Sequence, residues 1–451
     1  MGFIKQCWRE SRAYRILLVA AIIYAVLRLA IQIYLFSDAL KPEAIAEGAQ
    51  VSADLQESYI PAAQHFQAGE DLYLKGSLEV LEFHFPYSPA FAFLFMPILL
   101  LPLNTLVPIL LILHIIAYGA FYIWWSHIFQ INNLQHVAKV WAWTLPLFLV
   151  FSPFWDDLAY LNIYLITALF ATFLIDAVLQ ERLGWSIFWL GAVILPIKPH
   201  WGFAAALPLL LGRYRFFFKL IMGSIIAYLA VAGITILGGG LDYGIRQYQD
   251  YFGFLARLSR DFPWWGPDKP FLGYNHSVMQ IVLYYLGVSA ANMRLATLIK
   301  LLLLLPLGLI GLKFLRHPIG NAGDQFPEIA LVWAFALYLG AFIWLDMVWE
   351  LSLSLVIFAY LLATIQQKWI RILLWGLFGP YALLDIWRLA SYIGFGDSIL
   401  YEGAYVLTDP FIYIPWIMII LLIFYVLLLN RLASFSAKPA KMEMNKNSQV
   451  F

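Results

Sequence analysis

Apolar runs long enough to cross a membrane recur along the whole chain, and this feature limits the possible folds most strongly. A run of about 18 or more apolar residues is typical of a transmembrane helix, because a helix satisfies its own backbone hydrogen bonds in lipid. Of the 451 residues, 63% are hydrophobic and only 12% are charged. A soluble chain of this length would need more polar surface. We therefore predict an all-α polytopic integral membrane protein.

The rest of the composition argues against several classes of function. Cys7 is the single cysteine, so the sequence contains no disulfide framework, redox pair or thiolate metal site. The net charge is +1, and no basic tract alternates with aromatic residues as in a nucleic-acid-binding chain. We expect no metal, no cofactor and no nucleic-acid partner.

Basic residues predict the orientation of the chain. Four of them precede or open the first apolar run, which covers about residues 15–36: Lys5, Arg9, Arg12 and Arg15. The positive-inside rule then places the N-terminus in the cytoplasm. No small-residue cleavage site follows this run, so we do not interpret it as a cleaved signal peptide. Arg28 lies within the run and is expected to face protein or water rather than lipid.

The later apolar runs predict about 11–13 transmembrane helices in one domain, residues 1–434, followed by a disordered cytoplasmic tail, residues 435–451. Basic residues fall at alternate ends of these runs: Arg182, Arg213, Arg215, Lys219, Lys313, Lys368 and Arg431. If all of them are cytoplasmic, both termini are cytoplasmic too. The stretch 88–125 is too long for one crossing and short for two. One half of it is therefore interpreted as re-entrant or lying on the surface.

Two large polar segments then lie outside, a first outer loop at 37–87 and a second at 239–277. The first is rich in acids: Asp38, Glu43, Glu47, Asp54, Glu57, Glu70, Asp71, Glu79 and Glu82. Such acids suit either a catalytic site or a solvated loop, and the solvated loop is the simpler interpretation. Tyr59, Ala62, Ala63 and Phe66 recur at helical spacing, which predicts a short helix on the membrane surface.

Because each apolar run has one cytoplasmic end, its opposite end should lie outside, and several of these outer ends carry polar residues. These are Asn162, Lys198, Asn275, Asp346 and Glu350, on the same side as Asp54 and Glu57. We expect Asp54, Lys198, Asn275 and Asp346 to surround one cavity open to the outer leaflet.

Short motifs occur in a fixed order between residues 15 and 365. The first outer loop contains Asp54, Tyr59, Ala62-Ala63, then Gly69 and Tyr73, then Phe85, Tyr87 and Pro89. Downstream are Asn162 before an apolar run, Ile197-Lys198-Pro199, Arg213-Tyr214-Arg215 and Asn275-His276-Ser277. In order and spacing, this set resembles glycosyltransferase family 87. That family comprises polyprenyl-phosphate-mannose-dependent mannosyltransferases with the GT-C fold.

The chain departs from the pattern of this family in four places. Tyr160 stands where Gln is usual, Ser88 replaces the first Pro of a Tyr-Pro-Pro motif, and Asp54 is one residue further from Tyr59. Trp344-Leu345-Asp346, with Glu350, occupies the place of a Ser-Trp-x-His-His turn. The resemblance therefore implies a GT-C-like fold and a hexose donor, but it does not fix the sugar.

The resemblance also implies roles for single residues. In a GT-C enzyme the general base is a carboxylate of the first outer loop, so Asp54 is the first candidate and Glu57 the second. The residues implied in substrate binding are Tyr59, Asn162, Lys198, His200, Asn275, Asp346 and Glu350.

Each of these binding residues has an alternative interpretation. Lys198 would suit a phosphate, or it could place its ammonium group at the membrane interface; His200 suits either a phosphate or packing. Asn162 and Asn275 could bind sugar hydroxyls or cap helices. Asp346 and Glu350 have i,i+4 spacing, which suits an acceptor sugar, a divalent ion or a solvated helix end.

These observations predict a membrane glycosyltransferase. It would transfer mannose or a similar hexose from a polyprenyl-phosphate donor to a lipid-linked or glycan acceptor outside the cytoplasm. The alternatives are a multi-span transporter or lipid flippase and, third, a polysaccharide polymerase or ligase. No inverted repeat is evident, and the polar residues gather at one face rather than at the midplane, which favours the enzyme over the transporter.

Overall fold

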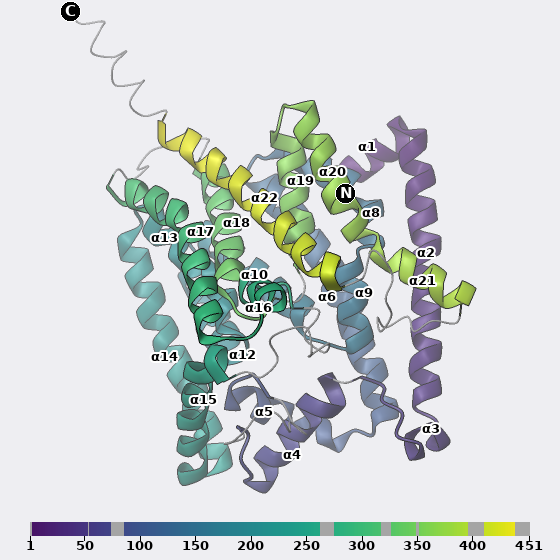
Figure 1. The fold of residues 1–451 in the computed structure, drawn as a ribbon, viewed down its shortest axis with the longest axis vertical. Helices are drawn as coiled ribbons and strands as arrows, with labels where there is room; N and C mark the ends of the chain where they lie inside the picture. Colours follow the sequence, from purple (N-terminus) through teal and green to yellow (C-terminus); the bar gives the residue numbers. More distant parts are fainter. Residues whose placement is uncertain are drawn as a thin grey trace, which may run out of the picture.

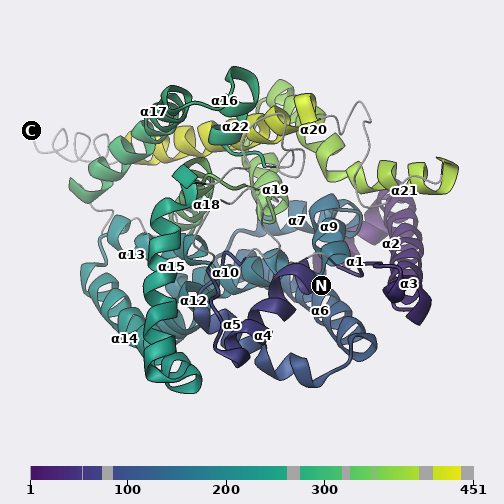
Figure 2. The same cartoon turned by 60° about the horizontal axis from the view of Figure 1, so that its bottom comes forward.

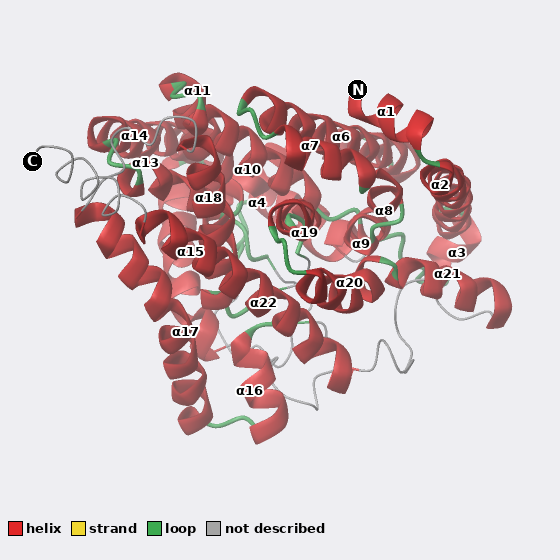
Figure 3. Ribbon diagram, turned by 90° about the horizontal axis from the view of Figure 1, so that it is seen from above, coloured by secondary structure: helices red, strands yellow, loops and turns green. Residues whose placement is uncertain are grey.

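The structure is a computed structural model that describes residues 2–52, 54–73, 85–261, 275–316, 326–348, 351–395 and 410–437. Over these residues the chain forms helices and loops, and none of them lies in a strand (Figure 3). This confirms the all-α prediction. The predicted tail falls almost entirely outside the described residues, since the last helix ends at Ala437.

Six helices are long and apolar enough to cross a membrane: α2 (Arg12–Ala39), α6 (Leu103–Ile131), α14 (Tyr214–Gly239), α17 (Ala290–Arg316), α18 (Phe326–Trp344) and α22 (Pro410–Ala437). Two bent pairs would raise the number to eight. In one, α7 (Gln135–Trp143) is followed at 51° by α8 (Leu145–Leu149) and α9 (Ser152–Tyr160). In the other, α20 (Lys368–Ala382) meets α21 (Leu384–Phe395) at 41°. The chain is therefore a multi-span membrane protein.

The remaining elements are shorter or more polar. Four further apolar segments of intermediate length are α5 with η3 (Pro89–Leu100), α10 (Tyr164–Leu179), α11 to α12 (Leu183–Ile197) and α19 (Ser354–Thr364). The number of 11–13 spans would be reached only if these segments crossed as well. The other elements are α1 (Gly2–Glu10), α3 (Pro42–Ala46), η1 (Asp54–Tyr59), α4 (Ile60–Ala68), η5 (Pro199–Ala206), α13 (Leu207–Leu210), α15 (Leu241–Asp261) and α16 (Val278–Leu286).

The ambiguous stretch 88–125 divides at its prolines. Pro89–Phe95 forms α5, Met96–Leu100 forms the 3-10 helix η3, and Pro102 caps the start of α6. Proline cannot donate a backbone hydrogen bond and restricts the residue before it, so the two prolines at 97 and 102 disfavour a continuous helix there, whereas the single Pro108 is accommodated within α6. Only α6 is long enough to cross, which agrees with the expectation that half of the stretch does not.

The first outer loop lies at one end of the molecule, opposite the N-terminal helix. In Figure 1, α3, α4 and α5 are at the bottom, whereas α1, α13 and α20 are near the top. Helix α14 runs between these ends, and its last residues, Gly238 and Gly239, approach Phe93 and Phe66 of the lower end. The first outer loop and the N-terminal helix thus lie at different ends of the molecule, and the side of the membrane on which each end lies stays a prediction from the basic residues.

The intramembrane arginine is enclosed by protein, as expected. Arg28 is 1% exposed, and its Nε lies 3.0 Å from Oδ2 of Asp385 on α21. Its guanidinium also donates to Gln32 at 2.8 Å. Arg388, one turn further along α21, pairs with Asp156 of α9. Two buried ion pairs therefore connect α21 to α2 and to α9.

Residues 239–277, the predicted second outer loop, contain a helix: α15 occupies 21 of them and packs against α14 and α5 (Figure 2). The predicted helical pair at the end of α18, in contrast, was wrong. Helix α18 ends at Trp344, and residues 345–348 are not helical. Asp346 therefore does not lie on a helix, and Glu350, its predicted partner at i+4, lies outside the described residues.

Candidate functional site

The first outer loop forms a hydrogen bond with the end of α9 just before Asp54. The Ser52 hydroxyl donates to the carbonyl of Tyr160 and accepts from the backbone N–H of Leu55 at 3.2 Å. The Gln56 side chain accepts from the N–H of Val51 at 2.6 Å. Asp54 then opens the π-helix η1. Single π-turns are rare and frequently occur at functional sites.

The turn after α9 is built around Asn162. Leu161 adopts a left-handed conformation with φ of 49°, which is uncommon for a residue with a side chain. The carboxylate of Asp157 accepts from the N–H groups of Tyr164 at 3.1 Å and Leu165 at 3.0 Å, so it caps α10. His114 of α6 contacts the carbonyl of Asn162 at 2.5 Å. These contacts fix the position of the Asn162 side chain.

Asn162 connects Asp54 to a pair of tyrosines. Its amide nitrogen donates to Oδ2 of Asp54 at 2.7 Å, and its amide oxygen accepts from the Tyr59 hydroxyl at 3.2 Å. The Tyr59 and Tyr87 hydroxyls are 3.3 Å apart. Asn162 thus contacts the candidate base directly. Its amide oxygen also accepts from the N–H of Ile163 at 2.7 Å, just before the two N–H groups of α10 that Asp157 binds.

Asp54 has the properties of a base that works near neutral pH. Its side chain keeps some solvent access, yet protein atoms surround it closely. Desolvation raises the pKa of Asp54 to about 6, against the opposing effects of the Lys198 charge and the Asn162 hydrogen bond. A carboxyl with this pKa accepts and releases protons at physiological pH.

Lys198 supplies a positive charge beside this carboxyl. It follows α12, and its Nζ lies 3.3 Å from the ring centroid of Tyr164 and 5.1 Å from that of Tyr87. Rings placed this way attract a cation through their quadrupoles. Desolvation lowers the pKa of Lys198 to about 7, although the charges of Asp54 and Asp157 act in the opposite direction. Within the described part of the chain, its ammonium donates no hydrogen bond.

The arrangement joins a proton acceptor to a cation within one partly enclosed cluster, which consists of Asp54, Tyr59, Tyr87, Asn162, Tyr164 and Lys198. We call it the Asp54 cluster. The carboxylate can remove a proton from a hydroxyl, and the ammonium retains donors for an anion. Four of the predicted site residues therefore come together: Asp54, Tyr59, Asn162 and Lys198.

Glu57 and His200 lie beside the cluster in different surroundings. Glu57 is exposed and accepts from Gln50 at 2.7 Å. The His200 ring packs 6.0 Å from that of Phe342 and 6.2 Å from that of Trp201. Desolvation and the Lys198 charge lower the pKa of His200 to about 3, so it is neutral at physiological pH. Their proposed substrate roles stay predictions.

Asn275 and Asp346 form a second set of contacts. The Asn275 amide donates to the backbone carbonyl of Asp346 at 2.7 Å and accepts from the N–H of Val348 at 2.9 Å. The Asp346 carboxylate pairs with Lys300, whose ammonium also donates to the Trp344 carbonyl at 2.9 Å. Asn275 is therefore engaged in holding two segments together, and the Asp346 side chain is already neutralised by a lysine.

Sequence reasoning missed Asp157, His114, Tyr164 and Lys300. A signal existed for His114, since an ionisable residue inside an apolar run suggests an internal partner. Among the described residues, no group of three or more His, Cys, Asp or Glu side chains could hold a metal ion.

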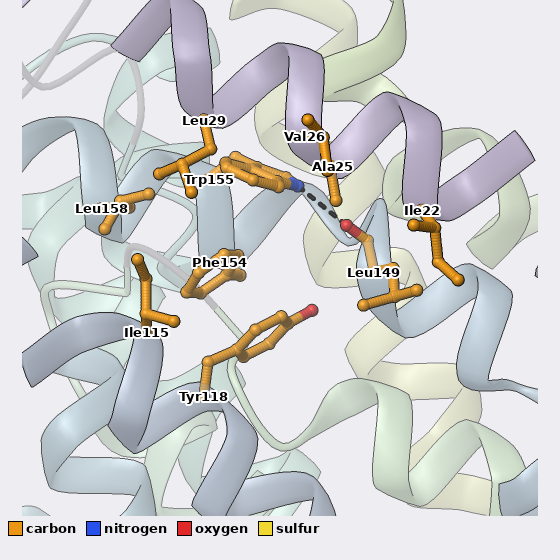
Figure 4. A pocket seen from close by; sticks show the side chains of 10 residues that line it. All are labelled: Ile22, Ala25, Val26, Leu29, Ile115, Tyr118, Leu149, Phe154, Trp155 and Leu158. Atoms are coloured by element: carbon orange, nitrogen blue, oxygen red, sulfur yellow. Dashed lines mark hydrogen bonds between the residues drawn. The ribbon is translucent and has the colours of Figure 1, made fainter. Parts of the chain in front are cut away.

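An apolar groove of about 220 Å³ lies between α2, α6, α8 and α9 (Figure 4). The indole of Trp155 borders it and donates to the carbonyl of Leu149 at 3.1 Å. Ile115 and Leu158 also line it. These two residues directly follow His114 and Asp157 in the chain, although Ile115 is 40% exposed and His114 is buried.

Over the residues that the structure describes, the fold and the Asp54 cluster define an all-helical, multi-span membrane protein in which a carboxylate of η1 lies close to a lysine that follows α12. Comparison with known proteins adds no identity: no family model matches the chain, and neither a curated protein nor a solved structure matches it significantly.

Proposed function

We propose that the protein is a membrane glycosyltransferase that uses a polyprenyl-phosphate sugar, with mannose or a similar hexose as the sugar. The acceptor is a lipid-linked or glycan hydroxyl on the extracytoplasmic side. The observation that carries this proposal is the Asp54 cluster, in which a carboxyl with a pKa of about 6 lies beside a lysine held between two tyrosine rings.

The proposed step uses both charges of the cluster. Asp54 takes the proton of the acceptor hydroxyl while the oxygen of that hydroxyl forms a bond to the anomeric carbon of the donor. The bond between that carbon and the phosphate oxygen breaks, and its electron pair leaves with the polyprenyl phosphate. Lys198 donates hydrogen bonds to the departing phosphate and stabilises its growing negative charge.

The apolar groove supports a donor with a hydrocarbon tail. It is lined by Ile22, Val26, Leu29, Ile115 and Leu158. We propose that a polyprenyl chain in this groove extends toward the Asp54 cluster, because α6 and α9, which line the groove, also carry His114 and Asp157 in contact with Asn162. The GT-C assignment rests further on the ordered motifs described in the sequence.

A transporter or lipid flippase is the second candidate, because the ion pairs Arg28–Asp385 and Arg388–Asp156 lie between helices of the membrane region. Intramembrane charges often mark substrate paths. In both pairs, however, the arginine is neutralised by the aspartate beside it, which suits a structural connection between helices.

The two candidates are separated by an assay in detergent, where no sealed compartment exists. The purified protein is incubated with a panel of radiolabelled polyprenyl-phosphate hexoses and a membrane-lipid extract as acceptor source. A glycosyltransferase releases free polyprenyl phosphate and forms a new labelled product. If donor stays intact in detergent but moves across the bilayer of sealed proteoliposomes, the transporter is the correct assignment.

A further inference from the structure

A basic pocket lies at the opposite end of α14 from the Asp54 cluster. It has a volume of about 530 Å³, and its charged lining residues are Arg213, Arg215, Lys219 and a single acid, Glu181. The chain enters it through Gly212, whose φ of 75° allows the turn between α13 and α14. From Arg215 to Gly239 the helix rises roughly 36 Å, so the pocket is far from the outer segments.

One of the three cations forms part of the pocket wall. The guanidinium of Arg213 lies 2.8 Å from the Glu181 carboxylate and 4.3 Å from the centroid of the Phe326 ring. These contacts neutralise the only acid in the lining and hold Arg213 in place.

The other two cations remain available for a ligand. Arg215 and Lys219 are exposed and lie four residues apart, on the same face of α14. Neither forms an ion pair or a hydrogen bond with any residue that the structure describes. The pocket therefore presents two adjacent positive charges, and it requires a ligand that carries negative charge.

The surface next to the pocket indicates what kind of anion this is. Directly beyond Lys219, the outward side of α14 carries Met222, Ile226 and Leu229, which are 57%, 64% and 60% exposed. Trp185 on the neighbouring α11 is 58% exposed as well. Exposed apolar side chains in a membrane protein face lipid tails, and exposed tryptophan is typical of the interface. The pocket thus lies where hydrocarbon meets headgroups.

We propose that this pocket binds the phosphate headgroup of an anionic phospholipid, whose acyl chains lie along the apolar side of α14. Arg215 and Lys219 contact the phosphate, and Arg213 bounds the site. The positive-inside pattern predicts that the lipid belongs to the cytoplasmic leaflet. This site is separate from the Asp54 cluster, and the proposal does not depend on sugar transfer.

Titration of the purified full-length protein in mild detergent tests this site. Dioctanoyl-phosphatidylglycerol is added, bound lipid is counted by native mass spectrometry, and dioctanoyl-phosphatidylcholine serves as the neutral comparison. Each basic residue near a membrane surface contributes about a fivefold factor in binding, so the double variant R215Q/K219Q should bind phosphatidylglycerol about 25-fold more weakly. E181Q should bind it more tightly, because it removes the competing acid.

The matched control is K368Q, which removes an exposed lysine from the first turn of α20 at the same end of the molecule. It should leave phosphatidylglycerol binding unchanged. Equal weakening by K368Q would show that only net charge matters, and unchanged binding by R215Q/K219Q would remove the site. Displacement of the lipid by inorganic phosphate at millimolar concentration would show that the pocket takes a free anion, which also overturns the proposal.

Discussion

Replacing Asp54 by asparagine removes the proposed base with little change in shape. Its Oδ2 accepts from Asn162 at 2.7 Å, and an asparagine oxygen can accept the same hydrogen bond. The hydrogen bond weakens by about 1 kcal/mol when its acceptor is neutral, but asparagine also avoids the desolvation cost that raises the pKa of Asp54, so D54N should be no less stable than the wild type at pH 7. Loss of a positioned base, by contrast, costs about 10²–10⁴ in rate. D54N should therefore fold normally and transfer almost no sugar.

The pH dependence of kcat/KM tests the same residue independently. Asp54 must be ionised, so the rate rises as pH increases through its pKa of about 6. Lys198 must be protonated, so the rate falls as pH increases through its pKa of about 7. The wild-type profile should be bell-shaped with its maximum between these values. D54N should lose the rising limb, and its falling limb should move to lower pH because Lys198 loses a stabilising negative charge.

The assay measures release of polyprenyl phosphate from the donor by purified protein, between pH 5 and 9. E57Q is the matched control, since Glu57 lies on the same short helix but is exposed. It should keep nearly full activity, with the rising limb shifted slightly to lower pH because the Glu57 charge raises the pKa of Asp54. Near wild-type turnover by D54N would refute the assignment of the base, and inactivation by E57Q alone would move it to Glu57.

Three further predictions follow from single contacts. K198M should lower kcat/KM about 10- to 100-fold, the loss of one charge-assisted hydrogen bond, and a mutant with unchanged kinetics would exclude Lys198 from phosphate binding. R28L should lower the free energy of unfolding by about 3–5 kcal/mol, because it leaves Asp385 buried and unpaired. The double variant R28L/D385L should recover most of that loss. Equal melting temperatures for the two variants would contradict this prediction. G191A should cost about 1–3 kcal/mol, because its Cβ would lie 2.5 Å from the carbonyl oxygen of Ser224, while G119A, with open space at that position, should be neutral or slightly stabilising.

The membrane-spanning elements could be predicted well because hydropathy reports contact with lipid. The first apolar run, expected at about residues 15–36, is α2 at Arg12–Ala39. Arg28 was correctly expected to face the interior, since a charge within such a run needs a partner. Its partner, Asp385, is 357 residues away in the chain, and no local pattern indicates which distant acid that is.

Part of the candidate site could also be predicted from the positions of polar residues relative to the apolar runs. Asp54, Asn162 and Lys198 each stand at the end of an apolar run or in the outer loop, and alternation of sides brings such residues together. Asn275 and Asp346 satisfy the same rule, yet they contact each other and Lys300. Which polar residues meet depends on how helices pack, and spacing along the chain does not contain that information.

The end of α18 shows a second limit of the sequence. Asp346 and Glu350 have i,i+4 spacing, but the helix stops at Trp344, before either residue. The Asn275 amide instead donates to the carbonyl of residue 346 and accepts from the N–H of residue 348. Such contacts with a residue about 70 positions away in the chain cannot be predicted from the local sequence.

The most direct test of the central claim is an experimental structure of the protein with a bound polyprenyl-phosphate hexose, obtained with the inactive D54N variant. We predict that the phosphate lies within about 3 Å of the Lys198 ammonium, that the anomeric carbon faces position 54, and that the tail enters the groove beside Leu158. Donor density with its phosphate at the basic pocket of Arg215, or anywhere else away from Lys198, would contradict the assignment of the Asp54 cluster as the site of sugar transfer.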